Sequence, residues 1–200
     1  MPKRRKPAAR NDGPQVNNSK PALSVARKRV SRIPDKTLLN YPFTDSGNAE
    51  RLVLLFGDRI RYCRTYRVWL VWDGKRWKRD MDGELNRMAK EVARRLNTQA
   101  LSIQDDEEQH EVENFARHSE SAAGIRATLE CAQSEQGISI GADELDRDPM
   151  LLNCANGTVD LQTTELRPHS SADLIAKLCP VVFDLDAQCI LFLRFLVLLY

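Results

Sequence analysis

Two short motifs have residue types that could support phosphoryl-transfer chemistry. Asp184 and Asp186 are two residues apart, a spacing that puts both carboxylates on one face of a strand, where they could hold metal ions. The other motif is the Gly-Lys pair at 74–75. A phosphate-binding loop requires G-x-x-x-x-G-K-[ST], but Trp69 stands where its first glycine should be and Arg76 where its hydroxyl residue should be. We therefore expect no catalytic centre in this chain, and we keep the two aspartates as an alternative metal site.

The segment around the Gly-Lys pair predicts a β-hairpin. Asp-Gly at 73–74 lies between two β-rich runs, and this dipeptide favours a two-residue turn because both turn residues must adopt positive φ. With that turn, Trp72 pairs with Lys75 and Leu70 pairs with Trp77. Side chains alternate across a strand, so the hairpin has two different faces. The predicted core face consists of Val68, Leu70, Trp72 and Trp77, and the opposite face consists of Trp69, Val71, Arg76 and Lys78.

The second face of this hairpin is a candidate nucleic-acid-binding surface. An aromatic ring beside two cations can stack on a base and contact phosphates, which makes Trp69, Arg76 and Lys78 candidate binding residues. The alternative is that Trp69 packs under a helix, while the aliphatic stems of Arg76 and Lys78 lie along the surface with their charges in water.

The amino-terminal segment is strongly basic. Residues 1–32 hold ten Lys and Arg residues against one acidic residue, a net charge of +9, whereas the rest of the chain holds 20 basic and 27 acidic residues, a net charge of −7. Residues 1–40 are rich in Pro, Asn and Ser and poor in aromatics, so we predict that they are disordered. The segment could bind phosphates, act as a nuclear-import signal or remain a solvated tail. Its candidate phosphate contacts are Lys3, Arg4, Arg5, Lys6, Arg27, Lys28 and Arg29.

The cysteines and histidines lack the spacing of metal ligands. The five cysteines are widely spread without a C-x-x-C pair, and we interpret them as small buried hydrophobic residues. His110 and His118 are interpreted as surface residues. No apolar segment follows the basic start, and residues 190–200 are too short to span a bilayer and contain Arg194. We expect a cytoplasmic protein without membrane contact.

Hydrophobic periodicity predicts an α+β fold with two β-hairpins flanking a central group of about three helices. A first helix is expected from about residue 48, capped by Asp45 or Ser46 and ended by Gly57. The main folded domain is assigned to residues 41–189, and residues 190–200 are expected to begin a linker helix. The other expected segments are strands 60–63, 66–72 and 75–78, a helix over 83–100, two helices within 107–135 broken near 119–123, strands 151–154, 158–162 and 165–167 with a turn at 156–157, and extended segments near 181–183.

Several of these segments together resemble one family. They are the blocks Thr44–Arg51, Gly57–Tyr62, Trp69–Trp77, Leu151–Leu161 and Glu165–His169. In this order they resemble the domain that precedes the superfamily 3 helicase in phage and plasmid primases and in poxvirus-type nucleoside triphosphatases. The joint occurrence of these blocks is more specific than any one of them, and the resemblance extends over about residues 44–189.

The resemblance implies a non-catalytic domain of a replicative primase-helicase that helps to bind or load single-stranded or fork DNA. It implies that ATP and Mg²⁺ act in the helicase motor of the full-length family, before which this chain stops, and that no cofactor binds here. A homo-oligomeric ring, commonly a hexamer, is expected only with the helicase domain present. The expected setting is the cytoplasm of a bacterial host, encoded by a prophage or plasmid. The alternatives are a metal-dependent primase fragment that uses Asp184 and Asp186, or a pure oligomerisation scaffold.

The chain departs from the family pattern at two places. Thr164 stands where such sequences often have Gly, so a turn with positive φ would be strained here or replaced by a wider loop. After Cys189 the family usually has Pro and an amphipathic helix, whereas residues 190–200 are almost entirely apolar. We therefore expect that the helix beginning at Ile190 has its packing partner in sequence outside this chain.

Overall fold

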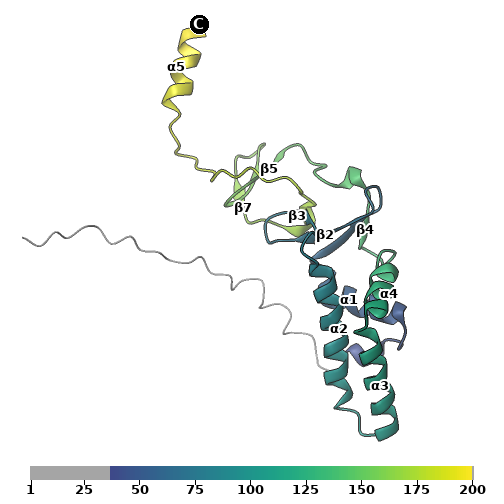
Figure 1. The fold of residues 1–200 in the computed structure, drawn as a ribbon. Coiled ribbons are helices and arrows are strands. Elements are labelled where there is room, and N and C mark those ends of the chain that lie inside the picture. Colours follow the sequence, from purple (N-terminus) through teal and green to yellow (C-terminus); the bar gives the residue numbers. More distant parts are fainter. Residues whose placement is uncertain (1–36, 200) are drawn as a thin grey trace, which may run out of the picture. The chain divides into compact units, whose positions relative to one another are not determined.

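The computed structural model describes residues 37–199, which form an α+β body within the compact unit Arg32–Tyr200 (Figure 1). Two sheets flank the helices α2, α3 and α4 in the sequence, which confirms the predicted fold class. The basic residues proposed between Lys3 and Arg29 lie outside the described residues. So does most of the segment that we predicted to be disordered.

The first helix begins and ends at small residues. In α1 (Asp45–Phe56), the Thr44 hydroxyl accepts a hydrogen bond from the Gly47 N–H at 3.1 Å, so the cap is Thr44 rather than Asp45 or Ser46. Gly57 ends the helix as predicted, and its N–H donates to the Val53 carbonyl. Gly47 allows the preceding loop to approach closely, because a Cβ there would lie 2.0 Å from the Pro42 carbonyl oxygen.

A buried arginine holds the residues in front of α1. Its guanidinium donates to the carbonyls of η3 (Thr37–Asn40) and the following loop, at Leu38 (2.9 Å), Tyr41 (2.5 Å) and Pro42 (2.9 Å). This residue, Arg51, is 0% exposed, and burial lowers its pKa to about 10, an effect that the neighbouring Glu50 carboxylate opposes. Leu38 is also buried. The sequence predicted that ordered structure begins at residue 41. In the structure, η3 and the buried Leu38 already lie before that residue.

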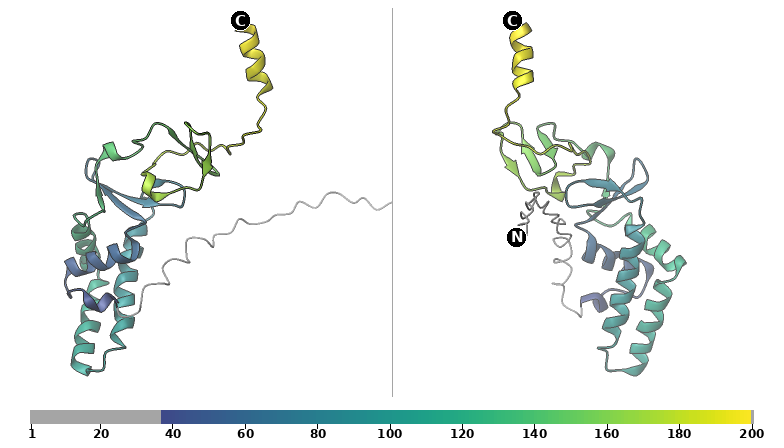
Figure 2. Two further views of the ribbon diagram at one scale, coloured as in Figure 1. Left: turned by 180° about the vertical axis from the view of Figure 1, so that it is seen from behind. Right: turned by 60° about the vertical axis from the view of Figure 1, so that its left-hand side comes forward.

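Helices α1 to α4 pack against one another, α1 against α4 and α2 against α3, as two further views show (Figure 2). Asp105 caps α3 by accepting from the N–H groups of Glu107 and Glu108, and Ser121 caps α4 by accepting from Gly124. The chain therefore breaks between α3 and α4 where the sequence predicted it. The bounds of these helices are Glu84–Ala100 for α2, Asp106–Ser119 for α3 and Ala122–Ala132 for α4.

The first sheet has the strand order β3-β2-β1-β4. Three of its strands are sequential and antiparallel, and the fourth pairs in parallel with β1 after the helices, a pairing that the sequence did not predict. Its core face carries the buried cluster Cys63, Leu70, Trp77 and Ile140. Ile60 and Val71 pair on the opposite face and are 0% exposed, and α2 packs against β2. The strands are β1 (Ile60–Cys63), β2 (Val68–Trp72), β3 (Trp77–Arg79) and β4 (Ser139–Ile140).

The second sheet, β5-β6-β7, is an antiparallel ribbon. Cys154 pairs with Gly157, so the turn is at 155–156, one residue before the predicted position. Thr164 has φ 62°. Of the two alternatives given for this position, a strained turn and a wider loop, the strained turn is confirmed. The elements of this part are η4 (Ala142–Glu144), β5 (Leu151–Cys154), β6 (Gly157–Asp160), β7 (Leu166–Arg167) and η5 (Ser171–Asp173).

The predicted terminal helix is present as α5 (Ile190–Leu199). Those of its apolar side chains whose placement is described, among them Leu191 and Leu198, are more than half exposed. None of the described helices is long and apolar enough to cross a membrane. Cys63 and Cys154 are buried as interpreted, whereas Cys131 and Cys179 are half-buried and Cys189 is exposed.

Candidate nucleic-acid interface

The β2–β3 hairpin has a different register from the one that we predicted. Trp72 pairs with Trp77 and Val71 with Lys78, so the connection is a four-residue loop, Asp73–Arg76, and not the two-residue Asp-Gly turn. Asp73 organises this loop by accepting at 2.9 Å from the N–H groups of Lys75 and Arg76. The predicted register was therefore wrong because the Asp73 side chain caps a longer loop.

The predicted core face survives this shift, but the candidate binding face does not. Trp72 and Trp77 lie on the core face with ring centroids 5.7 Å apart, and Trp77 is 1% exposed. Trp69 and Lys78 do share the opposite face with buried Val71. Arg76 belongs to the loop and not to this face, so the three candidate residues are not brought together as predicted.

Trp69 packs within the sheet. It pairs with Tyr62 on β1, and the two ring centroids are 5.2 Å apart in a tilted arrangement. The side chain is half-buried on the face that α2 covers. This geometry favours the alternative in which Trp69 packs under a helix over the alternative in which it stacks on a base.

The two cations of the hairpin keep much of their charge available. Lys78 is 40% exposed at its side chain, and its Nζ is 3.9 Å from the Asp82 carboxylate. Arg76 is also 40% exposed, and its Nε is 3.9 Å from the Asp73 carboxylate without a hydrogen-bond partner. Both separations are at the outer limit of an ion pair. Neither carboxylate therefore fully neutralises its cation. The side chains of Arg76 and Lys78 both remain available to a phosphate.

A buried asparagine ties the β2–β3 loop to the second sheet. Asn153 Nδ2 donates to the carbonyls of Lys75 (2.9 Å) and Lys177 (3.0 Å), and its Oδ1 accepts from the Thr158 hydroxyl (3.2 Å). Lys75 Nζ donates to the Ala155 carbonyl at 2.7 Å. The position of Arg76 is therefore fixed by contacts from residues about 80 positions away.

A histidine completes this cluster. The Asn153 Oδ1 also lies 2.8 Å from His169 Nδ1, and because Nδ2 is committed to two carbonyls, Nδ1 is the donor and carries the proton. The other ring nitrogen is buried and has no partner in hydrogen-bonding geometry. Burial lowers the pKa of His169; the nearby Ala155 carbonyl opposes this, and the Lys75 cation adds to it.

The alternative metal site loses its structural basis. Asp184 and Asp186 do not lie on a strand: the Asp184 carboxylate accepts from the Asp186 N–H at 3.0 Å, which is a local turn. Nor did the extended segment near 181–183 form a strand. Within residues 37–199, no group of three His, Cys, Asp or Glu side chains could hold a metal ion. His110 and His118 are exposed, as interpreted.

An open groove of about 580 Å³ lies beside the second sheet. Glu144, Asp148 and Asp173 line it together with Arg147 and apolar side chains. Its balance of charge is acidic, and Asp173 is already paired with Arg167 at 2.8 Å. This lining is unfavourable for a polyanion, so the groove is not a candidate phosphate site.

Three polar residues, Arg51, Asn153 and His169, become important only in the folded structure. Arg51 is buried and bonds to carbonyls 9 to 13 residues before it, and His169 is half-buried beside Asn153; no local pattern marks either residue. Asn153 stands beside a strand-turn motif, where an asparagine is commonplace. In addition, the exposed turn at 64–67 carries cations and an aromatic ring, and its composition could have been noticed in the sequence.

The family comparison agrees with this architecture. A family described as "D5 N terminal like" matches residues 49–197, which is most of the chain and nearly all of the body that the structure describes. No curated protein matches the chain. The match covers every described strand and helices α2 to α4, together with most of α1 and α5. The chain therefore belongs to the D5 N-terminal-like family, the N-terminal region of phage and plasmid primase-helicases.

Proposed function

We propose that this domain is a non-catalytic DNA-binding module of a replicative primase-helicase, which helps to hold or load single-stranded or fork DNA for the helicase motor. The observation that carries the proposal is the distribution of charge. Residues 1–32 have a net charge of +9 beside a body of −7. A concentrated block of Lys and Arg releases counterions when it binds a polyphosphate, which gives affinity without sequence specificity.

The β2–β3 hairpin supports the same proposal. Arg76 and Lys78 are partly exposed cations with only distant carboxylates, and the Asn153 cluster holds the loop of Arg76 in place. In this proposal they contact backbone phosphates, with the basic tail residues supplying most of the affinity. Trp69 shares a face of the sheet with Lys78 but not with Arg76, and substitution of Trp69 tests whether it contributes to binding.

The experiment is fluorescence anisotropy of the whole chain with single-stranded, duplex and forked DNA at several salt concentrations. The comparison protein has Lys3, Arg4, Arg5 and Lys6 changed to Gln, and a second has Arg76 and Lys78 changed to Gln. We expect affinity to fall steeply with salt, and the slope to decrease by about 0.7–0.9 for each phosphate contact removed. Absence of DNA binding at low salt would overturn the proposal.

ATP hydrolysis, Mg²⁺ binding and unwinding belong in this proposal to the helicase motor of the intact protein. A second candidate function is subunit assembly, which the exposed apolar side chains of α5 favour. Sedimentation velocity separates the two. A chain that binds DNA as a monomer supports the DNA-binding module, and a stable oligomer without DNA affinity supports the scaffold.

A further inference from the structure

The connection between β1 and β2 presents an aromatic ring flanked by arginines. The 64–67 turn consists of Arg64, Thr65, Tyr66 and Arg67, and all four residues are exposed. Tyr66 is 65% exposed, more than any other aromatic side chain in the part of the chain that the structure describes. A large exposed ring without packing contributes nothing to the stability of this fold. Its position at the end of a hairpin therefore suggests that it contacts a ligand.

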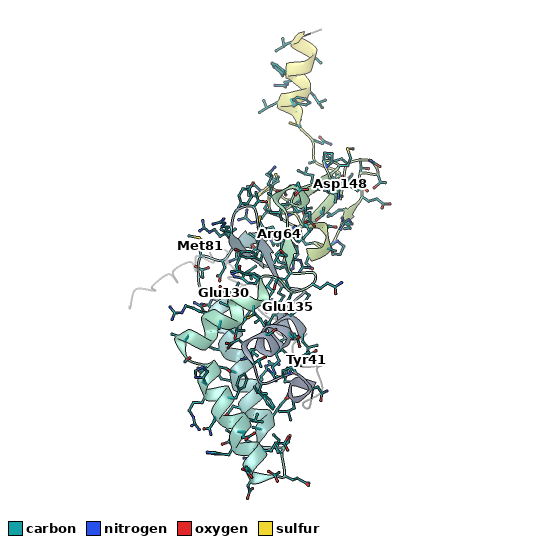
Figure 3. The ribbon with its side chains drawn as sticks, turned by 90° about the vertical axis from the view of Figure 1, so that its right-hand side faces the viewer. Tyr41, Arg64, Met81, Glu130, Glu135 and Asp148 are labelled. Atoms are coloured by element: carbon teal, nitrogen blue, oxygen red, sulfur yellow. The ribbon has the colours of Figure 1, made fainter. Side chains whose placement is uncertain are left out.

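The base of this turn is held firmly. The Arg64 N–H donates to the Ile140 carbonyl at 3.0 Å, and the Thr65 hydroxyl accepts from the Ala142 N–H at 3.1 Å. Both contacts attach the turn to the end of β4, and Figure 3 labels Arg64 at this place. Thr65 is thus used for anchoring, while the side chains of its neighbours remain free to meet a ligand.

The two arginines of the turn are unpaired within the part of the chain that the structure describes. Among residues 37–199, neither Arg64 nor Arg67 forms an ion pair or a side-chain hydrogen bond, and no ring packs on Tyr66. The acidic element η4 follows β4, and its Glu144 carboxylate accepts from the Gly141 N–H at 2.7 Å. The positive charge of the turn is therefore not neutralised within the body.

Arg67 also has an unfavourable backbone conformation. Its φ is 53°, in the left-handed region that glycine or asparagine adopts most easily. An arginine here costs about 1 kcal/mol relative to glycine, so the turn carries local backbone strain. Strained residues of this kind concentrate where a side chain contacts a ligand.

We propose that the 64–67 turn binds single-stranded DNA: the Tyr66 ring stacks on one unpaired base, and Arg64 and Arg67 contact the phosphates on either side of it. This inference rests on the proposed function and names the strand state that the domain recognises. Bases inside a duplex are already stacked on each other, so an exposed ring between two cations fits a single strand. An acidic peptide would use the arginines but would leave the ring without a partner.

The test is Tyr66→Ala in the whole chain, with anisotropy measured on fluorescein-labelled oligothymidine and on a duplex of equal length. We expect a roughly 5- to 100-fold loss of affinity for the single strand, as for one stacked base, and unchanged affinity for the duplex. Tyr66→Phe keeps the ring and should retain binding. Because the side chain is exposed, thermal unfolding should be the same for all three proteins.

The arginines are tested by charge removal. Arg64→Gln with Arg67→Gln should lower the salt slope for the single strand by roughly 0.7 for each residue. Lys90→Gln is the matched control, because Lys90 is an exposed cation on α2 and away from the turn. Crosslinking with an oligothymidine that contains one 5-iodouracil should also label Tyr66, located by mass spectrometry.

The outcomes separate this inference from the proposed function. If the unchanged protein binds no DNA, the proposed function fails. If it binds DNA and Tyr66→Ala has no effect on the single strand, or weakens duplex binding equally, the stacking contact is wrong and the proposed function stands. Tighter binding of oligouridine than of oligothymidine would overturn the assignment to DNA.

Discussion

Asn153 donates a hydrogen bond to the Lys75 carbonyl at 2.9 Å and so joins the two sheets across 78 residues of sequence. The side chain is 4% exposed and makes three further hydrogen bonds, to Lys177, Thr158 and His169. This amide is one of the contacts that hold the loop carrying Arg76, together with the Asp73 carboxylate and the Lys75 bond to Ala155. Any DNA contact made by that loop therefore depends on the packing of the second sheet.

Asn153→Ala should destabilise the protein by about 2–4 kcal/mol, because it leaves several buried donors and acceptors without partners. The measurement is urea denaturation followed by tryptophan fluorescence. Asn156→Ala is the matched control: Asn156 also bridges two segments, through the Phe183 backbone, but it is exposed. It should cost under about 1 kcal/mol. Equal effects of the two substitutions would show that the Asn153 cluster is not a special anchor.

His169 should make the protein less stable in acid. Its folded-state pKa is lowered, chiefly by burial, so the unfolded chain binds a proton more readily than the folded one. The contribution of neutral His169 to the free energy of unfolding is fully present above the unfolded-state pKa of about 6.5. This contribution decreases as the pH falls through that value towards the folded-state pKa. His169→Asn keeps an N–H donor towards Asn153 and should flatten this decrease between about pH 7 and pH 5. His110→Gln, an exposed control, should leave it unchanged.

The two tryptophans on opposite faces of the first sheet should differ in their effect on stability. Trp77→Ala removes a side chain that is 1% exposed and whose Nε1 donates to the Ser171 carbonyl at 2.8 Å. We expect a loss of about 3–5 kcal/mol, enough to unfold a marginal domain. Trp69→Ala removes a half-buried ring that pairs with Tyr62, and it should cost about 1–2 kcal/mol. Thermal unfolding by circular dichroism distinguishes them, and the reverse order would invalidate the face assignment.

Thr164→Gly should stabilise the protein by up to about 1 kcal/mol. Thr164 has φ 62°, a strained value for a β-branched residue, and glycine relieves the strain at some cost in unfolded-state entropy. Gly137→Ala is the converse control: Gly137 has φ 77° with no atom within 4 Å of a new Cβ, so only backbone strain is added. That variant should lose about 1 kcal/mol. The midpoint of thermal unfolding measures both, and a lower midpoint for Thr164→Gly would contradict the expected relief of strain.

The sequence by itself determined most of the local structure. The helical periods, the break between α3 and α4 and the end of α1 at Gly57 depend on contacts within a few residues, so their patterns were sufficient. The predicted core face of the β2–β3 hairpin was also correct, because Trp72 pairs with Trp77 instead of Lys75, and a shift of two residues keeps each side chain on its face. The strain at Thr164 was foreseeable for the same local reason.

Tertiary structure decided the hairpin register and the composition of the candidate surface. The preference for an Asp-Gly turn is a local effect of about 1 kcal/mol or less, and it was outweighed by the pairing of Trp72 with Trp77 over the core and by the loop contacts of Asp73. The parallel pairing of β4 with β1 and the placement of the Arg51 guanidinium over the Phe115 ring likewise join residues far apart in the chain. No short pattern contains such contacts, because their free energy exists only once the helices and both sheets have packed together.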